Sequence, residues 1–247
     1  LGVRSTPALL QWIRDDSIAP WAIRALTDRR EELAGISTTA LVGALGSPRE
    51  RTRREAAIAL GRLGDPTASR SLTSLLSDHD PIIAHATVQA LRTLKADEAC
   101  LAVVDNPEAP KSRRTGALQV LQSLHTPEVV SALMERLGRE SDPERRAGLL
   151  TALCRLYFKE GVWKGDSWGT RPDTRGPFYQ PEDWSETSRI AKTLKQVLQR
   201  TEPKEAAFLG REFARHRIPA AEALDTLIVR AQAEPSLGSA LAAQLAD

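Results

Sequence analysis

Residues that commonly support covalent or metal chemistry are scarce in this chain of 247 residues. It contains two cysteines, four histidines and one methionine, and only 4% of its residues are aromatic. The histidines lie in separate segments without the H-x-x-x-H spacing of a zinc site, and no Cys pair accompanies them. The sequence therefore predicts no metal and no cofactor. Cys100 and Cys154 fall in different predicted helices, too far apart for a disulfide, and we expect buried thiols.

Long apolar runs and a strong net charge are also lacking. No stretch of about 18 apolar residues suggests a membrane span. The net charge is +2, which predicts no strong attraction to nucleic acid or to an anionic surface. The chain opens LGVRSTPALLQW, with neither an initiator Met nor a signal segment, so we expect a piece of a longer or processed protein.

A repeat of about 31 residues is the main feature that the sequence does contain. Four segments superpose without gaps: RREAAIALGRL (53–63), AHATVQALRTL (84–94), RTGALQVLQSL (114–124) and RAGLLTALCRL (146–156). Two leucine positions recur three residues apart, on one helical face, beside a position that holds a small residue. The leucines are Leu60, Leu91, Leu121 and Leu153, then Leu63, Leu94, Leu124 and Leu156; the small-residue position holds Ala59, Ala90, Val120 and Ala152.

A second helix is predicted after each of the first three segments. Pro66 and Pro127 suit a first helical turn, where a backbone N–H is not needed, and Asp65 and Thr126 suit the caps before them. The pairs Asp80-Pro81 and Asp142-Pro143 begin the next first helices in the same way. Helix pairs of this kind must stack to bury their apolar faces, so we predict an all-α protein, a right-handed α-solenoid.

The repeat resembles HEAT repeats, whose first helix often carries an Arg before an A-A-x-A-L-G-x-L run. RTRREAAIALGRLGD (residues 51–65) follows that pattern most closely. The Arg position is filled by Arg53, Arg114 and Arg146, whereas Ala84 replaces it in the second unit. We therefore expect the contact made by this Arg to be missing there.

The predicted organisation is one solenoid over residues 1–247. Residues 48–161 form its four-unit core. Residues 7–46 are expected to form a capping pair, and residues 186–246 about four capping helices without the leucine frame. Between core and C-terminal cap, residues 162–185 are expected to form one long ordered loop, with Gly161 ending the preceding helix.

This loop departs from the composition of the rest of the chain. Its stretch WKGDSWGTRPDTRGPFYQPEDW (residues 163–184) holds three of the five tryptophans, together with Phe178, Tyr179 and three prolines. So many large aromatic side chains disfavour disorder. We expect the loop to fold back onto the solenoid.

The loop and its flanks also resemble the HEAT-repeat region of large multidomain proteins of planctomycetes, in which a sugar-dehydrogenase-like propeller precedes the repeats and a c-type cytochrome follows. The motif WGTRPDTRGPFY is the most specific part of the resemblance, and Ser167 stands where a Trp is common. Neither a propeller pattern nor the haem signature C-x-x-C-H is present here. The resemblance implies an exported, periplasmic or extracellular, parent protein with electron-transfer neighbours.

Seven loop residues are the candidate binding residues. They combine aromatic faces with Arg and Asp side chains, which could dock a neighbouring domain or bind a sugar. The alternative is structural, with the aromatic side chains pinning the loop to the helices. The seven residues are Trp163, Trp168, Arg171, Asp173, Arg175, Tyr179 and Trp184.

Two other functions can be weighed against docking. The loop carboxylates have no His, Cys or Ser constellation beside them, so we predict no enzyme. The pairs Arg53-Arg54, Arg113-Arg114 and Arg145-Arg146 could line a groove for a phosphate backbone, but acidic neighbours favour pairing between repeats. We therefore predict a non-catalytic scaffold that positions neighbouring domains or a protein partner; the alternatives are a carbohydrate-binding surface and a nucleic-acid-binding protein.

Overall fold

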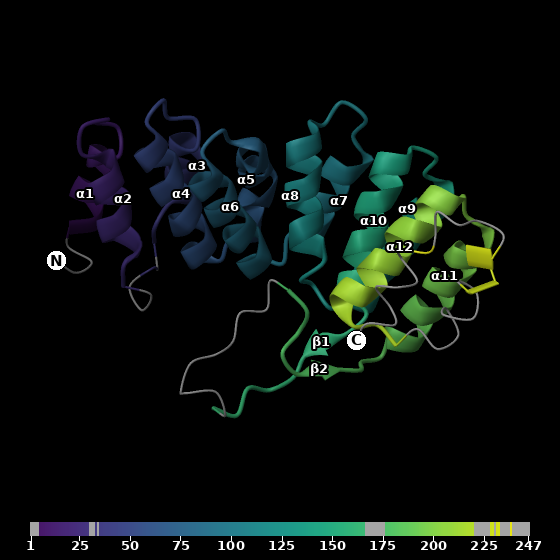
Figure 1. Cartoon of the computed structure of the whole chain (residues 1–247). Coiled ribbons are helices and arrows are strands. Elements are labelled where there is room, and N and C mark those ends of the chain that lie inside the picture. Colours follow the sequence, from purple (N-terminus) through teal and green to yellow (C-terminus); the bar gives the residue numbers. More distant parts are fainter. Residues whose placement is uncertain are drawn as a thin grey trace. The chain divides into compact units, whose positions relative to one another are not determined.

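The protein consists almost entirely of helices in the part of the chain that its computed structural model describes. That part comprises residues 5–29, 33, 35–165, 176–219, 228–229, 231–232 and 238. It divides into two compact units, Leu1–Leu124 and His125–Asp247, and each unit is built from neighbouring helices (Figure 1). No described helix is both long and apolar enough to cross a membrane.

The first unit stacks its helices around α4 and α6. Helix α4 packs on α2, α3 and α6, and α8 packs on α6, α7 and η4. The helices are α1 (Thr6–Trp12), α2 (Ala19–Thr27), α3 (Thr38–Ala44), α4 (Glu50–Leu63), η3 (Pro66–Ala68), α5 (Ser69–Leu72), η4 (Thr73–Ser77), α6 (Pro81–Thr93), α7 (Asp97–Asp105) and α8 (Lys111–Leu121).

The second unit surrounds α10 with three further helices. Helix α10 (Pro143–Leu156) packs on α9 (Pro127–Arg139), α11 (Thr187–Arg200) and α12 (Pro203–His216). Between α10 and α11 lie the strands β1 (Lys159–Glu160) and β2 (Pro181–Glu182). They pair antiparallel, Lys159 with Glu182 and Glu160 with Pro181.

The leucine frame forms the core of both units, as the sequence predicts. Leu60, Leu91, Leu121 and Leu153 are all 0% exposed. The small-residue position is also buried, and at Gly61 the helices α4 and α6 approach so closely that a Cβ would lie 2.9 Å from the Cα of Ala90. The second leucine position is less uniform, since Leu63 and Leu124 are half-buried.

The predicted caps are confirmed. The side chains of Asp65, Asp80, Thr126 and Asp142 each accept a hydrogen bond from a backbone N–H in the first turn of the following helix. Each cap is followed by Pro at the start of the helix. Residues close together in sequence therefore fix where these helices begin.

The second helix of the first core pair is not continuous. It is divided into η3, α5 and η4. The hydroxyls of Thr73, Ser74 and Ser77 donate to the backbone carbonyls of the residues three positions before them. Such bonds compete with the α-helical pattern, which explains the tighter 3-10 turns here.

Helix α10 ends at Leu156, so the prediction that it continues to Gly161 is wrong. Lys159 and Glu160 leave the helix to pair with β2, and the Gly161 N–H donates to the Gln180 carbonyl over 2.8 Å. A Cβ at Gly161 would lie 3.0 Å from that carbonyl oxygen and closer still to the Glu182 carboxylate. Gly161 therefore permits a close approach of two chain segments.

The predicted fold class, an all-α protein of stacked HEAT-like helix pairs, is confirmed. Helices α11 and α12 are the first two of the expected C-terminal capping helices, whereas most of the chain after residue 219 lies outside the described residues. Strand β1 directly precedes the predicted loop of residues 162–185, and β2 lies within its last part.

Candidate functional site

The base of the predicted loop is a hairpin held by one carboxylate. Glu160 accepts hydrogen bonds from the backbone N–H groups of Tyr179 and Gln180, at 3.0 and 2.7 Å. Together with the ladder of β1 and β2, these bonds satisfy backbone donors on the returning segment. The hairpin is therefore fixed at its base by hydrogen bonds to its main chain.

Side chains from outside α10 satisfy the carbonyls at its C-terminal end. The Trp184 indole Nε1 donates to the Leu156 carbonyl at 2.7 Å, and the Thr187 hydroxyl donates to the Tyr157 carbonyl at 2.8 Å. His125 Nε2 donates to the Phe158 carbonyl at 2.8 Å. Three successive carbonyls that a helix end leaves unpaired thus accept hydrogen bonds from side chains of other segments.

Aromatic side chains cover this helix end. The His125 ring lies 5.2 Å from the Trp184 ring, edge to face, and 6.0 Å from the Phe178 ring. The Arg155 guanidinium lies 3.6 Å from the Phe178 ring centroid and donates to the Gly176 carbonyl at 2.5 Å. Arg155 therefore braces the second half of the loop by a cation–π contact and a hydrogen bond.

The structure describes three of the seven predicted site residues. Trp184 is half-buried and bonded to α10, so it acts as a brace. Trp163 is also half-buried, and its indole N–H is buried without a hydrogen-bond acceptor among the described residues. Tyr179 is 46% exposed. The other four predicted residues, Trp168, Arg171, Asp173 and Arg175, lie outside the described residues.

Several residues of the hairpin are exposed. Val162 is 77% exposed, and Tyr179, its exposed neighbour across the hairpin, stands beside the exposed residues Pro181 and Glu182. We call Val162, Tyr179, Pro181 and Glu182 the hairpin surface. Sequence reasoning found only Tyr179 of these four.

The hairpin braces His125, Arg155, Glu160 and Thr187 were also missed by sequence reasoning. They lie outside the aromatic stretch, in residues that read as ordinary helix and turn sequence. Only Thr187 carries a local signal, because its hydroxyl also accepts from the Trp184 N–H three residues earlier, as in one half of a capping box.

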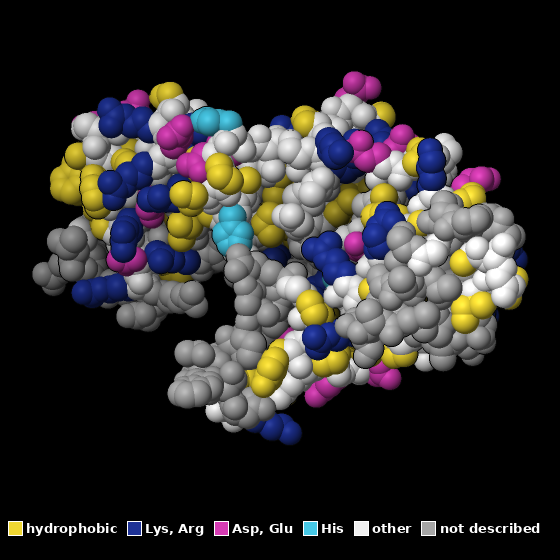
Figure 2. All heavy atoms as spheres, viewed as in Figure 1, with side chains coloured by type: hydrophobic (Ala, Val, Ile, Leu, Met, Phe, Trp, Pro, Cys, Tyr) yellow, Lys and Arg dark blue, Asp and Glu magenta, His cyan; other side chains and the backbone are white. Residues whose placement is uncertain are grey.

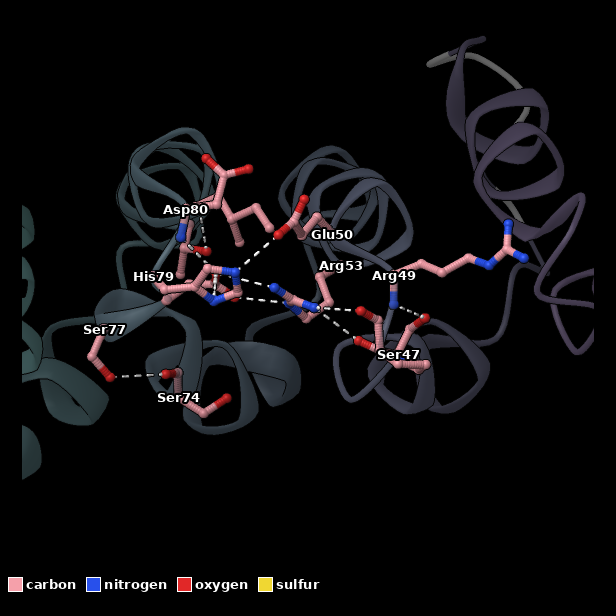
Figure 3. A network of polar contacts seen from close by, with 12 residues as sticks. Ser47, Arg49, Glu50, Arg53, Ser74, Ser77, His79 and Asp80 are labelled. Atoms are coloured by element: carbon pink, nitrogen blue, oxygen red, sulfur yellow. Dashed lines mark hydrogen bonds and ion pairs between the residues drawn. The ribbon is translucent and has the colours of Figure 1, made fainter.

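A second polar arrangement ties the repeats together, and Figure 3 shows it around Arg53. The guanidinium makes two bonds to the Asp78 carboxylate, at 2.8 and 3.1 Å, and two to the carbonyls of Ser47 and Pro48. His79 stands beside it, 2.9 Å from Glu50. Arg53 thereby joins the start of α4 to the turn before it and to the end of η4.

Arg146 makes the corresponding tie in the second unit. It donates twice to Glu205 of α12, at 2.7 and 3.0 Å, and to the carbonyls of Leu137 and Glu140 at the end of α9. Arg114 donates to the Ala109 carbonyl before α8. The recurring Arg therefore bonds backbone carbonyls in the segment just before its own helix, a contact that Ala84 has no side chain to make.

These ties shift the pKa values of their members. Burial alone would raise the pKa of the Asp78 carboxyl, but hydrogen bonds from Arg53 and from the Asp80 backbone hold it below its usual value. Burial alone would also raise the pKa of the Glu205 carboxyl, but the hydrogen bonds from Arg146 and Thr201 hold it below its usual value. The side-chain bonds to Asp78 and Glu205 raise the pKa values of Arg53 and Arg146.

The arginine ties weaken the nucleic-acid alternative. Arg53, Arg114 and Arg146 donate hydrogen bonds to acceptors within the protein, and Arg54 pairs with Glu55 at 3.2 Å. On the face shown in Figure 2, basic and acidic side chains are interspersed. These four arginines are therefore engaged within the protein, which leaves fewer of their donors for the phosphate backbone that the nucleic-acid alternative requires.

The remaining titratable clusters offer little chemistry. Among the described residues, no three His, Cys, Asp or Glu side chains lie close enough together to hold a metal ion. Cys100 and Cys154 are buried free thiols, as predicted, and burial raises the pKa of Cys100 to about 12. A thiol with so high a pKa is a poor nucleophile at neutral pH.

Comparison with known proteins agrees with the repeat architecture. A comparison with curated proteins gives no match. Among solved structures, an archaeal HEAT-like repeats protein from Thermococcus onnurineus NA1 is 12% identical, with a TM-score of 0.41, over 97% of this chain and 98% of that one. A designed armadillo repeat protein in complex with the peptide (KR)4 is 13% identical, with a TM-score of 0.40, over 84% and 98% of the two chains. Residues 6–92 match the family model of HEAT repeats, a range that covers the predicted N-terminal capping helices, the first core unit and most of the first helix of the second.

Proposed function

We propose that this chain is a scaffold that docks a neighbouring domain or a protein partner through the hairpin surface. The observation that carries the proposal is the contrast within the hairpin. The bonds of Glu160, Trp184 and Thr187 fix the hairpin and the end of α10, whereas Val162 and Tyr179 are 77% and 46% exposed. A rigid aromatic and aliphatic pair loses little side-chain entropy on binding, which favours protein docking.

Docking also accounts for the repeat framework. Stacked helix pairs with buried leucines and arginine ties present a surface of fixed geometry, and no step of a reaction is needed for that role. We infer that the chain works by position rather than by catalysis. The carbohydrate alternative, which centres on the loop, is not favoured by the described loop residues, because Trp163 and Trp184 are both half-buried.

Site-specific photo-crosslinking tests the docking role. A photoreactive phenylalanine analogue is placed at Val162 or at Tyr179, with Ile82, which is 58% exposed on α6 in the first unit, as the matched control position. We expect a discrete protein adduct from the two hairpin positions and not from Ile82. Equal adducts from all three positions, or none from the hairpin, would reject the hairpin surface as the docking site.

We also propose, on the resemblance of WGTRPDTRGPFY, that the parent protein is exported and carries redox domains. Haem staining and intact-mass measurement of the native protein test this context. A haem-bearing species larger than this chain, in the exported fraction, is the expected result. A haem-free species in the cytoplasmic fraction would contradict it without touching the docking role.

A further inference from the structure

A groove in the second unit is separate from the hairpin and carries a different chemistry. Its volume is about 720 Å³, within the range of roughly 300–1,000 Å³ typical of ligand sites. It lies at the C-terminal ends of α9 and α11 and at the first turns of α10 and α12. Among its described lining residues, none belongs to the hairpin.

Two side-chain contacts join α9 to α11, and one of them, between Thr193 and Met134, lies in the groove lining. Nearer the start of these helices, Arg189 donates to the Ser131 hydroxyl at 2.8 Å and Thr193 donates to the Met134 sulfur at 3.6 Å. One turn further along α9 stands Gly138, where an added Cβ would meet nothing within 4 Å. The absence of a side chain at Gly138 thus leaves space in the groove.

The groove has apolar lining residues, and its charged residues Arg146 and Glu205 are held in place by bonds to each other. Met134, Leu137 and Val197 line it. The Arg146–Glu205 ion pair closes one end, and the four bonds of Arg146 to Glu205, Leu137 and Glu140 leave it committed to the protein. An apolar group entering the groove would meet side chains that are already held in place.

The rim carries an excess of positive charge. Arg200 and Lys204 are exposed and form no ion pair with a described residue. Glu202 is the one rim carboxylate without an ion pair among the described residues, because Glu205 is held by Arg146 and Thr201. Two available cations against one carboxylate favour an anionic group at the edge of the groove.

We propose that this groove binds a peptide segment of a partner protein in which an aspartate or glutamate lies next to a bulky apolar side chain. The apolar side chain enters between Leu137 and Val197, and the carboxylate lies at the rim beside Arg200 and Lys204. A continuous chain fits better than a detached small molecule, because the rim residues are exposed and a groove open along its side lets a backbone pass. This site is independent of the hairpin surface.

A defined peptide array tests the proposal by fluorescence anisotropy. Each labelled octapeptide places Asp or Glu next to Leu, Met, Phe or Trp, and each has a twin with Asn or Gln and another with Lys in place of the acid. We expect an acidic member to bind in a saturable way, and its amide and Lys twins to bind weaker by on the order of tenfold. Binding should weaken as salt is added.

Three variants assign the binding to the groove. The Arg200→Glu, Lys204→Glu double variant should weaken binding by on the order of tenfold. Gly138→Leu should do the same by filling the space, without lowering the melting temperature, because Leu is a better helix former than Gly. Lys192→Glu, an exposed position on α11 outside the groove lining, is the charge-reversal control and should stay within about twofold.

The outcomes separate the proposal from its rivals. If no acidic peptide binds, or if Gly138→Leu and the double variant bind as the wild type does, the groove is not a peptide site. If a long-chain fatty acid binds in the groove and the peptides do not, the occupant is a small amphipathic molecule and the proposal fails. Crosslinking at Val162 and Tyr179 is unaffected in either case, so the docking role stands or falls separately.

Discussion

Helices α4 and α10 occupy the same place in the repeat and end in different ways. Both have 14 residues and bury the equivalent leucine completely. Helix α4 ends at Gly64, whose φ of 75° is left-handed, and Asp65-Pro66 starts the next helix at once. Helix α10 ends at Leu156, where side chains as far along the chain as Trp184 and Thr187 satisfy its last carbonyls. A local signal stops one helix, and tertiary contacts stop the other.

The largest expected effect tests what the two helices share. Leu60→Ala and Leu153→Ala each empty a fully buried leucine site, so each should lower the free energy of unfolding by about 3 kcal/mol. Urea unfolding followed by circular dichroism measures both. Values that differ by more than about 1.5 kcal/mol would mean that the two positions are not equivalent in packing.

A smaller effect tests the tertiary stop of α10. Thr187→Val removes the buried hydroxyl that donates to the Tyr157 carbonyl and accepts from the Trp184 N–H, so we expect a loss of about 1–2 kcal/mol. Thr187→Ser keeps the hydroxyl and is the control. Equal losses in both variants would show that the methyl group, not the hydrogen bonds, matters here.

The left-handed C-cap of α4 is expected to contribute somewhat less to the free energy of unfolding. Gly64→Ala forces a side chain into a left-handed backbone, and thermal melts should show a loss of about 1 kcal/mol. Gly138→Ala is the matched control, because Gly138 lies within a helix with open space around it and should gain stability. A neutral Gly64→Ala variant would contradict the role of the left-handed cap.

The smallest effect is a pH dependence carried by the arginine tie. The folded-state pKa of Asp78 lies below its unfolded value, so its contribution is fully present above about pH 4 and is lost as the pH falls through the folded value. Between pH 5 and pH 2.5, wild type should therefore lose about 1 kcal/mol more stability than Asp78→Asn. Asp16→Asn, an exposed control in the same unit, should lose stability as the wild type does.

Sequence periodicity was sufficient to predict most of the repeat helices. Their starts follow from caps and prolines next to them in the chain, and their buried faces follow from leucines at helical spacing. The exceptions have physical causes. The hydroxyls of Thr73 and Ser74, at the start of η4, bond to nearby carbonyls and break the predicted helix.

The candidate site was predictable only in part. Its aromatic composition identified the loop and Tyr179, and it identified Trp184, which turns out to be a brace. Glu160 and His125 could not be found, because each acts on backbone groups about 20 or more residues away in the chain. Backbone N–H and carbonyl groups leave no trace in the sequence of the residue that bonds to them.

By itself, the sequence of this protein determined the helix pairs, their caps, the buried leucine face and the departure of residues 163–184 from that pattern. The tertiary structure decided which side chains close the end of α10, which carboxylates hold Arg53 and Arg146, and where the groove beside Gly138 opens. The reason is the range of the interactions. Periodicity and capping act within one or two helical turns, whereas ion pairs and carbonyl bonds join residues that only folding brings together.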